Sequence, residues 1–446
     1  MSVDPKTSPS RQLRWGIGSR VLLLVAGFIL AGGAAAMAYF TIGVIDASGN
    51  NAIAQATGLS APAIPTATET AATRVKVAWT LPGSQLPGAS YQVTASPGGA
   101  TCTSSGNSCS VTGLAIGTPY TFSVMGILDN WQSLSVATSF TTLGVTTTSL
   151  ANGVAGASYS ATLTATGGIG TYTWALVSGI LPAGLSLDAS SGAITGTPTV
   201  ADTTSGLTFT VTDSSGFTST SGSQSITVTR ATPTIATTLS ASSTTVGGTT
   251  YDTSSFTGLV NSDGTGTVTY SYFTDNACSV SPVAGGVKTV PTNGSAPNST
   301  TVTFANAGSY YWQAVYSGDS NNNSASSPCT LGNNELLTVN AATPTNVVAD
   351  NATPALGESV TFTATITGPA GATAPAGGTV VWTVSGTSGA TSCTTSSDTT
   401  LNASSQATCV LTTANAGTYV VSDSWSGTSN YNSKASANDT VTVTNV

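Results

Sequence analysis

The side chains of this chain that could do chemistry are mainly carboxylates and cysteines. The 446 residues include 17 aspartates and glutamates, six cysteines and no histidine. Histidine is the commonest general base near neutral pH, so a Ser-His-Asp or Cys-His arrangement is excluded. Glycoside hydrolysis needs only two carboxylates, but the acids after residue 45 are scattered singly along the chain. We therefore expect a protein that is not an enzyme.

Calcium is the metal that these carboxylates would suit best, because it binds several oxygen ligands at once. The candidate ligands are Asp188, Asp202 and Asp213, with Asp319 in "SGDSN" as a fourth. The alternative interpretation is that single aspartates in "DASSG" and "DSSG" stabilise turns through their own backbone. No D-x-D-x-D run is present. We expect no cofactor, with calcium as the alternative.

The elements that must position these groups are expected to be β-strands. Only 6% of the residues are charged, compared with about 25% in ordinary soluble domains, whereas 39% are hydrophobic. Threonine and valine favour strands, and glycine and serine favour turns. Four of the nine basic residues precede residue 21, so the rest of the chain has no basic patch for nucleic acid. The composition predicts an all-β protein that binds no nucleic acid.

An uncharged apolar run from Val21 to Ile45 follows these four basic residues. Its 25 residues could cross a bilayer, and the basic residues predict that residues 1–20 lie in the cytosol. The stretch "GGAAAMAYFT" also fits a signal-peptidase site, and it resembles the N-termini of bacterial surface proteins processed by an archaeal-type signal peptidase. A retained transmembrane helix and a cleaved signal peptide both stay open. In either case a linker over 46–64 and all later residues are expected outside the cell.

The first module is expected at residues 65–142. In "TRVKVAWTL", Val75, Val77 and Trp79 alternate with other residues at the period of a strand. The stretch "GLAIGTPYTFSVMG" contains the pattern L-x-x-G-x-x-Y, in which Tyr120 would close a turn by bonding the backbone. These stretches resemble a fibronectin type III domain, with Trp79 as its buried tryptophan.

The second module is expected at residues 143–230, and it contains the glycine-rich stretch "LPAGLSLDASSGAITGTP". A phosphate-binding loop would require a following helix with Lys and Ser or Thr, and the sequence offers neither. Together with "GLTFTVTDSSG", the stretch resembles an immunoglobulin-like module of bacterial surface proteins that is related to cadherin-like domains. The resemblance implies short strands joined by tight turns, and cadherin-like modules often bind calcium between domains.

The last two modules, at residues 231–340 and 341–446, repeat one another. "ANAGSYYWQAVYSGDSNNNSASS" at 305–327 aligns without gaps to "ANAGTYVVSDSWSGTSNYNSKAS" at 414–436, and 12 of the 23 positions are identical. The offset of 109 residues suits an immunoglobulin-like sandwich of about 100 residues. Both modules resemble bacterial immunoglobulin-like repeats. The resemblances imply four tandem immunoglobulin-like β-sandwiches after one N-terminal transmembrane or signal helix.

The module boundaries given by these resemblances also pair the cysteines. Six cysteines allow 15 pairings, and pairing within modules leaves Cys102–Cys109, Cys278–Cys329 and Cys393–Cys409. No C-x-x-C spacing is present, so metal binding by cysteine is not indicated. Disulfides agree with a location outside the cytosol.

These features predict a surface stalk or adhesin-like display protein whose partner is an unidentified surface protein or glycan. One alternative is a secreted fibre subunit that assembles by strand addition, since a mature chain starting near "YFTIGVI" would begin with a strand-like segment. Another alternative is a carbohydrate- or cell-wall-binding protein, with Trp131 in "LDNWQS" as the candidate contact. The competing interpretation of Trp131 is packing against the edge of the first module.

Overall fold

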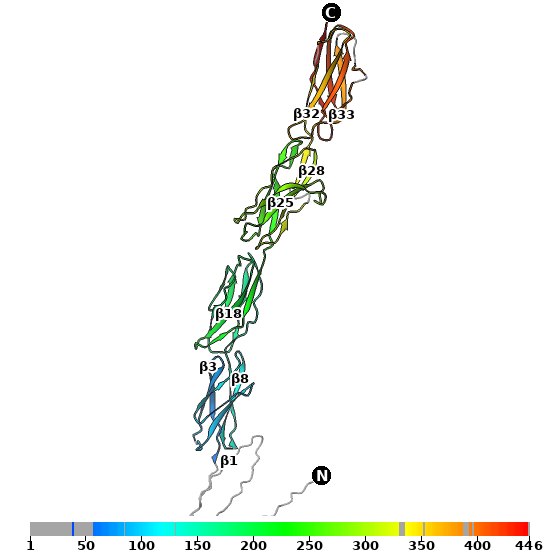
Figure 1. Ribbon diagram of the computed structural model, residues 1–446. Coiled ribbons are helices and arrows are strands. Elements are labelled where there is room, and N and C mark those ends of the chain that lie inside the picture. Colours follow the sequence, from blue (N-terminus) through cyan, green and yellow to red (C-terminus); the bar gives the residue numbers. More distant parts are fainter. Residues whose placement is uncertain are drawn as a thin grey trace, which may run out of the picture.

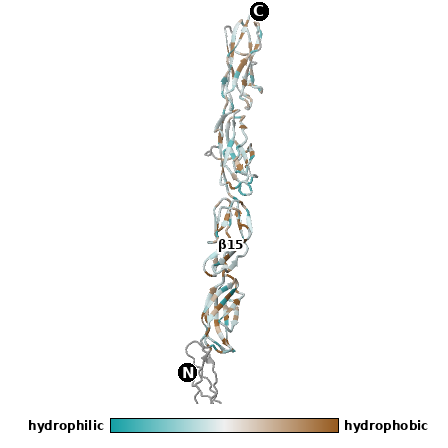
Figure 2. Ribbon diagram, turned by 90° about the vertical axis from the view of Figure 1, so that its left-hand side faces the viewer, coloured by the Kyte–Doolittle hydropathy of each residue, from teal (hydrophilic) through white to brown (hydrophobic). Residues whose placement is uncertain are grey.

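The computed structural model describes residues 38–39, 57–83, 85–129, 131–329, 335–350, 353–386, 392–394 and 397–444. These residues form strands and loops, in agreement with the all-β prediction. Apart from the first two short strands, the strands pair within four consecutive groups, which we call block one (63–141), block two (144–229), block three (234–340) and block four (345–443). Figure 1 shows the blocks following one another along an elongated molecule, and the view turned by 90° in Figure 2 has the same narrow outline.

The predicted transmembrane or signal helix over 21–45 lies outside the described residues, apart from two of them. Ala38 and Tyr39 form strand β1 (Ala38–Tyr39), which pairs antiparallel with β2 (Thr57–Gly58). The helix prediction is therefore wrong at these two residues, because their backbone pairs with a distant segment. Among the residues that the structure describes, no helix has the length and apolar character needed to cross a membrane.

Block one consists of two antiparallel sheets that enclose a core. One sheet has the order β3 (Ala63–Ala71), β4 (Arg74–Thr80), β7 (Ser108–Thr112), and the other β10 (Val136–Thr141), β8 (Pro119–Leu128), β5 (Ser90–Ser96), β6 (Thr101–Ser104), with β9 (Trp131–Gln132) beside β8. Trp79 is only 4% exposed and lies against Tyr91, with ring centroids 5.6 Å apart. The Tyr120 hydroxyl accepts a hydrogen bond of 2.9 Å from the Ala115 N–H, which confirms the predicted turn closure.

Block two places the glycine-rich stretch in a three-stranded sheet of order β13 (Tyr159–Thr162), β17 (Ala193–Gly196), β16 (Leu185–Leu187). The larger sheet has the order β12 (Gly153–Val154), β20 (Gln224–Thr229), β18 (Thr203–Asp213), β15 (Tyr172–Ser178), with β19 (Thr218–Thr220) beside β18, and β11 (Gly144–Val145) pairs with β14 (Ala165–Thr166). Gly192 turns between β16 and β17 at φ +72°, and a Cβ there would lie 2.8 Å from the Trp174 Nε1 atom. The stretch is therefore structural, because its turn must pass close over a buried tryptophan.

Block three has a main sheet of order β22 (Ser243–Thr245), β30 (Leu336–Asn340), β28 (Gly308–Tyr316), β25 (Thr267–Phe273), β26 (Val283–Thr289), with β29 (Ala325–Ser326) beside β28. Two further pairs are β21 (Thr234–Leu239) with β24 (Asp252–Thr257), and β23 (Thr249–Thr250) with β27 (Val302–Thr303). Trp312 and Tyr316 project from β28 and are fully buried. These aromatic side chains form the centre of the core of block three.

Block four has a three-stranded sheet of order β31 (Thr345–Ala349), β32 (Ser359–Thr367), β35 (Gln406–Thr412). The opposite sheet has the order β34 (Thr400–Leu401), β33 (Gly377–Gly386), β36 (Gly417–Trp425), β37 (Lys434–Ala435), with β38 (Asp439–Val443) beside β36. Trp425 is fully buried, as is Tyr316 at the aligned position of block three. The sequence repeat therefore corresponds to a repeated position in the core.

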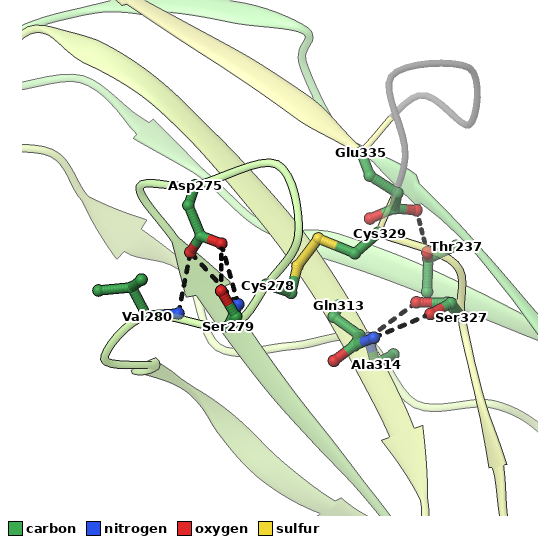
Figure 3. Close-up of a disulfide and its surroundings, with 10 residues drawn as sticks. All are labelled: Thr237, Asp275, Cys278, Ser279, Val280, Gln313, Ala314, Ser327, Cys329 and Glu335. Atoms are coloured by element: carbon green, nitrogen blue, oxygen red, sulfur yellow. Dashed lines mark hydrogen bonds between the residues drawn. A yellow bond between two sulfur atoms is a disulfide. The ribbon is translucent and has the colours of Figure 1, made fainter.

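Three disulfides link the cysteines in the pairs Cys102–Cys109, Cys278–Cys329 and Cys393–Cys409. The first joins neighbouring strands β6 and β7 of block one. The second ties the loop after β25 to the segment after β29 in block three, as Figure 3 shows. The third anchors a loop of block four to β35. Since each bond lies within one block, the disulfides constrain the blocks and leave the joints between them to other contacts.

The substitution Tyr120→Phe tests the turn closure in block one. We expect a loss of about 1 kcal/mol in the free energy of unfolding of this block, because the Ala115 N–H loses its acceptor while the ring stays packed. Urea unfolding followed by tryptophan fluorescence measures the loss. An unchanged midpoint would contradict the role given to the phenol oxygen.

Candidate functional site

The aspartates predicted as calcium candidates in block two lie apart. Asp202 directly precedes β18 and Asp213 ends it, so roughly 35 Å of strand separates them. Asp188 lies in the turn after β16, where its Oδ1 accepts hydrogen bonds of 2.7–3.0 Å from the backbone and hydroxyl groups of Ser190 and Ser191. These bonds, led by that from the Ser190 hydroxyl, lower the pKa of Asp188 to about 2. The carboxylate of Asp188 therefore stabilises its own turn.

Asp213 is nearly buried, and its carboxylate also bonds to local backbone. Its Oδ2 accepts a hydrogen bond of 2.8 Å from the Ile169 N–H, and its Oδ1 accepts bonds of 2.9 and 3.0 Å from the Ser215 and Phe217 N–H groups. Across the described part of the chain, no three Cys, Asp or Glu side chains gather in a group that could hold a metal ion. The structure does not bring the predicted calcium ligands together, and calcium binding stays a prediction.

Glu69 on β3, which sequence reasoning missed, lies at the joint between blocks one and two. It is fully buried, and its Oε2 accepts a hydrogen bond of 3.2 Å from the N–H of Leu143, in the two-residue connection between the blocks. Its Oε1 has no hydrogen-bond partner. Burial raises the pKa of Glu69, the Leu143 N–H lowers it, and the charge of Asp213 raises it further. The side chain therefore connects block one to the start of block two.

Trp131, the predicted sugar contact, lies on the short strand β9 opposite Leu128 of β8 and is half-buried. A separate open hollow of about 620 Å³ lies beside the joint between blocks two and three, where Asp202 and Arg230 are among its lining residues. Trp131 is not part of that hollow. The structure thus places the two predicted ligand candidates, Trp131 and Asp202, in different blocks.

Two buried carboxyl groups in block three were also missed by sequence reasoning. Asp252, at the start of β24, is fully buried, and neither of its Oδ atoms has a hydrogen-bond partner. Glu335, just before β30, accepts a hydrogen bond from the hydroxyl of Thr237, as Figure 3 shows. Burial, followed by the nearby charge of Glu335, raises the pKa of Asp252 to about 8. Burial also raises the pKa of Glu335 to about 7.

The joint between blocks two and three depends on an asparagine in the loop after β28. The side-chain Oδ1 of Asn321 accepts a hydrogen bond of 2.9 Å from the N–H of Ala201 in block two. Its backbone carbonyl accepts a bond of 2.9 Å from Ala231, in the connection between the blocks. Val260 of block three also packs on Gly156 of block two, where a Cβ would lie 2.3 Å from a Val260 methyl carbon. The loop that contains Asn321 is therefore hydrogen-bonded both to block two and to the connection between the blocks.

The carboxylate of Asp319 organises this joint loop. Its Oδ1 accepts hydrogen bonds of 2.9 Å from the N–H groups of Asn321 and Asn322, and its Oδ2 accepts a bond of 2.8 Å from the Tyr316 hydroxyl. These partners explain why Asp319 is buried, and they give this predicted calcium candidate a structural role.

The joint between blocks three and four repeats the same contact. The Oδ1 of Asn430 accepts a hydrogen bond of 2.8 Å from the N–H of Ala307, and its Nδ2 donates one of 2.8 Å to the Oδ1 of Asn306. Its backbone carbonyl accepts a bond of 3.0 Å from Ala342, which occupies the place of Ala231 at the previous joint. Asn430 aligns with Asn321 in the sequence repeat. The shared "SG-x-SN" pattern was the signal that could have identified both joints.

Two family models match this chain, and their matches lie between residues 60 and 229. Residues 60–141 match the fibronectin type III domain family, and residues 137–229 match the family described as "Putative Ig domain". Domains of these two kinds are typically non-catalytic structural modules. Among curated proteins, no sequence matches this chain.

Several solved structures are similar to this chain at low identity. Immunoglobulin domains 1–4 of Sidekick-1 are 14% identical, with 84% of this chain and 94% of that chain covered and a TM-score of 0.21. The FdeC adhesin of Escherichia coli is 15% identical, with coverages of 68% and 96% and a TM-score of 0.23. Chicken CNTN1 domains FN1–FN3 are 10% identical, with coverages of 60% and 95% and a TM-score of 0.23.

The buried acids of block three predict a stability that decreases as the pH rises. The ordinary pKa values of Asp252 and Glu335 are 3.8 and 4.5, so the unfolded chain releases both protons near pH 4, whereas the folded block keeps them until pH 7–8. The folded state therefore binds more protons in this window, and the melting temperature of block three should fall between pH 5 and pH 8. Calorimetry across this range measures the slope.

The variants Asp252→Asn and Glu335→Gln should each flatten this slope, since neither amide ionises. Asp188→Asn is the control, because its carboxyl group, with a pKa of about 2, is ionised across the whole range. A melting temperature of block three that rises with pH would contradict the assignment of neutral buried acids.

Proposed function

We propose that this chain, which carries a fibronectin type III domain and an immunoglobulin-like domain, is a non-enzymatic stalk that displays its outer end at a cell surface. Such domains, together with disulfides, suggest an extracellular or cell-surface protein. In this proposal each of the four blocks is one immunoglobulin-like sandwich. At about 35–40 Å for each block, the stalk would reach on the order of 150 Å.

The observation that carries this proposal is the repeated asparagine joint. The connection after block two has four residues, and so does the connection after block three. In both, an asparagine of the later block bonds to a backbone N–H of the earlier block and to the connection itself. Short connections with hydrogen bonds on both sides limit bending, which is the property that a stalk requires and a chain of independently moving domains lacks.

In this proposal, residues 21–45 are a membrane anchor or a cleaved leader. The partner is an unidentified surface protein or glycan. It needs neither a cofactor nor catalysis. Mass spectrometry of the native N-terminus, in membrane and secreted fractions, separates the two versions. A start at Met1 or Ser2 in the membrane fraction supports the anchored stalk, whereas a start near Tyr39 supports a released subunit.

Substitution of the joint asparagines tests the stalk directly. Asn321→Ala and Asn430→Ala should each leave a backbone N–H of the preceding block without its partner and allow that joint to bend. Small-angle X-ray scattering should then show a shorter maximum dimension, by roughly a tenth to a fifth for the double variant, because bent rods have closer ends. The melting temperatures of blocks two and four should change little. That of block three should fall in Asn321→Ala, because the Asn321 Nδ2 also donates a hydrogen bond of 2.8 Å to the Asn261 carbonyl within this block.

Asn438→Ala is the matched control, because this exposed asparagine lies outside both joints. Its scattering curve should equal that of the unaltered chain. A compact unaltered chain, or a double variant that stays as long as the unaltered chain, would contradict the proposal.

A further inference from the structure

The far end of block three, on which block four sits, has two contact points. The first is Gly247 at φ +84°, where a Cβ would lie 2.7 Å from the Ala370 carbonyl and 3.2 Å from the Pro369 ring of block four. The second is the pair Asn306 and Ala307, which binds the amide of Asn430. The Tyr310 hydroxyl donates a hydrogen bond of 3.0 Å to the Asn306 carbonyl and so fixes this pair.

The far end of block four carries the same features. Gly357 has φ +90°, and its N–H bonds to the Thr413 carbonyl at 2.8 Å, as the Gly247 N–H bonds to the Phe304 carbonyl at 2.7 Å. Asn415 and Ala416 stand at the positions of Asn306 and Ala307. The Tyr419 hydroxyl donates a hydrogen bond of 2.8 Å to the Asn415 carbonyl, which reproduces the bond from Tyr310. Both contact points of the joint are therefore present a second time.

The two ends differ in what covers them. Val246, beside Gly247, is 1% exposed and belongs to the core cluster that spans blocks three and four. Leu356, at the corresponding place beside Gly357, is 46% exposed. A Cβ at Gly357 would meet no atom within 4 Å, whereas one at Gly247 would meet block four. The end of block four thus presents an exposed leucine where block three has a buried valine.

We propose that residues 355–358 and 413–416 of block four form a docking face for a further immunoglobulin-like repeat joined in series. The occupant would place a small apolar turn, like that at Pro369 and Ala370, over Leu356 and Gly357. It would also direct an asparagine amide, like that of Asn430, toward Asn415. The carbonyl of the exposed Glu358 accepts a hydrogen bond from the Thr413 N–H, as that of Gly248 accepts one from the Phe304 N–H. The Glu358 side chain would therefore disfavour an acidic residue in the docking turn.

This inference rests on the geometry of the joints and does not depend on the display role proposed above. Other candidate occupants fit less well, because only a repeat supplies the turn and the amide at the spacing that block four already uses. A negative docking experiment would not contradict the stalk proposal. Bending of the stalk would not contradict the proposed docking face.

The test extends the full chain after residue 446 by a second copy of residues 343–446, which keeps the register of the existing connection. The copy carries Ser359→Thr and Thr412→Ser, two changes at exposed positions, so that its peptides differ in mass from those of block four. Amide hydrogen exchange in peptides covering 355–358 and 413–416 should become at least tenfold slower than in the unextended chain. Two variants should remove this protection: Leu356→Asp on the docking face, and Asn→Ala at the Asn430 position of the added copy. A separate melting transition shows that the added copy is folded in each variant.

The unextended Leu356→Asp chain is the control, and its melting temperature should stay unchanged because Leu356 is exposed. Exchange rates that do not respond to the folded extension would overturn the proposal. Protection that persists in both variants would also overturn it. Protection of the same peptides in the unextended chain at high concentration, with dimer formation, would assign the face to a second copy instead of a repeat in series.

Discussion

The elongated arrangement depends on a hydrogen bond between the side-chain amide of an asparagine and a backbone N–H of the preceding block. Asn321 makes this bond to block two, and Asn430 makes it to block three. A bond of this kind contributes about 1 kcal/mol by itself. It gains effect here because the same loop also bonds to the four-residue connection, so bending would break several contacts together. The first joint uses another device, since Glu69 of block one binds the Leu143 N–H through its carboxylate.

Several acidic side chains in the described part of the chain are buried or lie in turns. Asp252 and Glu335 are buried without a cationic hydrogen-bond partner, and burial raises the pKa of both. Asp188 and Asp319 instead accept local hydrogen bonds. Acidic side chains in these positions stabilise the fold. This agrees with the proposal that the blocks act as a stalk.

The core and the covalent links could be predicted from the sequence because they leave local patterns. The alternation of large apolar residues with other residues predicted the strand that carries Trp79, which is buried. The L-x-x-G-x-x-Y pattern predicted the turn that Tyr120 closes. The resemblance of the modules to known families gave the pairing of the cysteines. The glycine-rich stretch was interpreted as strands because no helix follows it, and it forms β16 and β17.

The joints and the buried acids could not be predicted in the same way. Asn430 bonds to Asn306 across 124 positions, and no local periodicity reports such a contact. Asp252 lies among threonines and serines that suggest an exposed strand, yet tertiary packing buries it completely. The calcium candidates were chosen by residue type, and two of them lie at opposite ends of β18: Asp202 just before it and Asp213 at its last residue. Their metal binding stays a prediction.

The most direct measurement is the distance distribution between spin labels placed on exposed positions of blocks three and four, recorded by pulsed electron paramagnetic resonance. Val287 and Val381 are suitable positions, because both side chains are more than half exposed. A locked joint predicts one narrow distribution that broadens in the Asn430→Ala variant. A distribution that is already broad in the unaltered chain would contradict the central claim that asparagine joints hold the blocks in line.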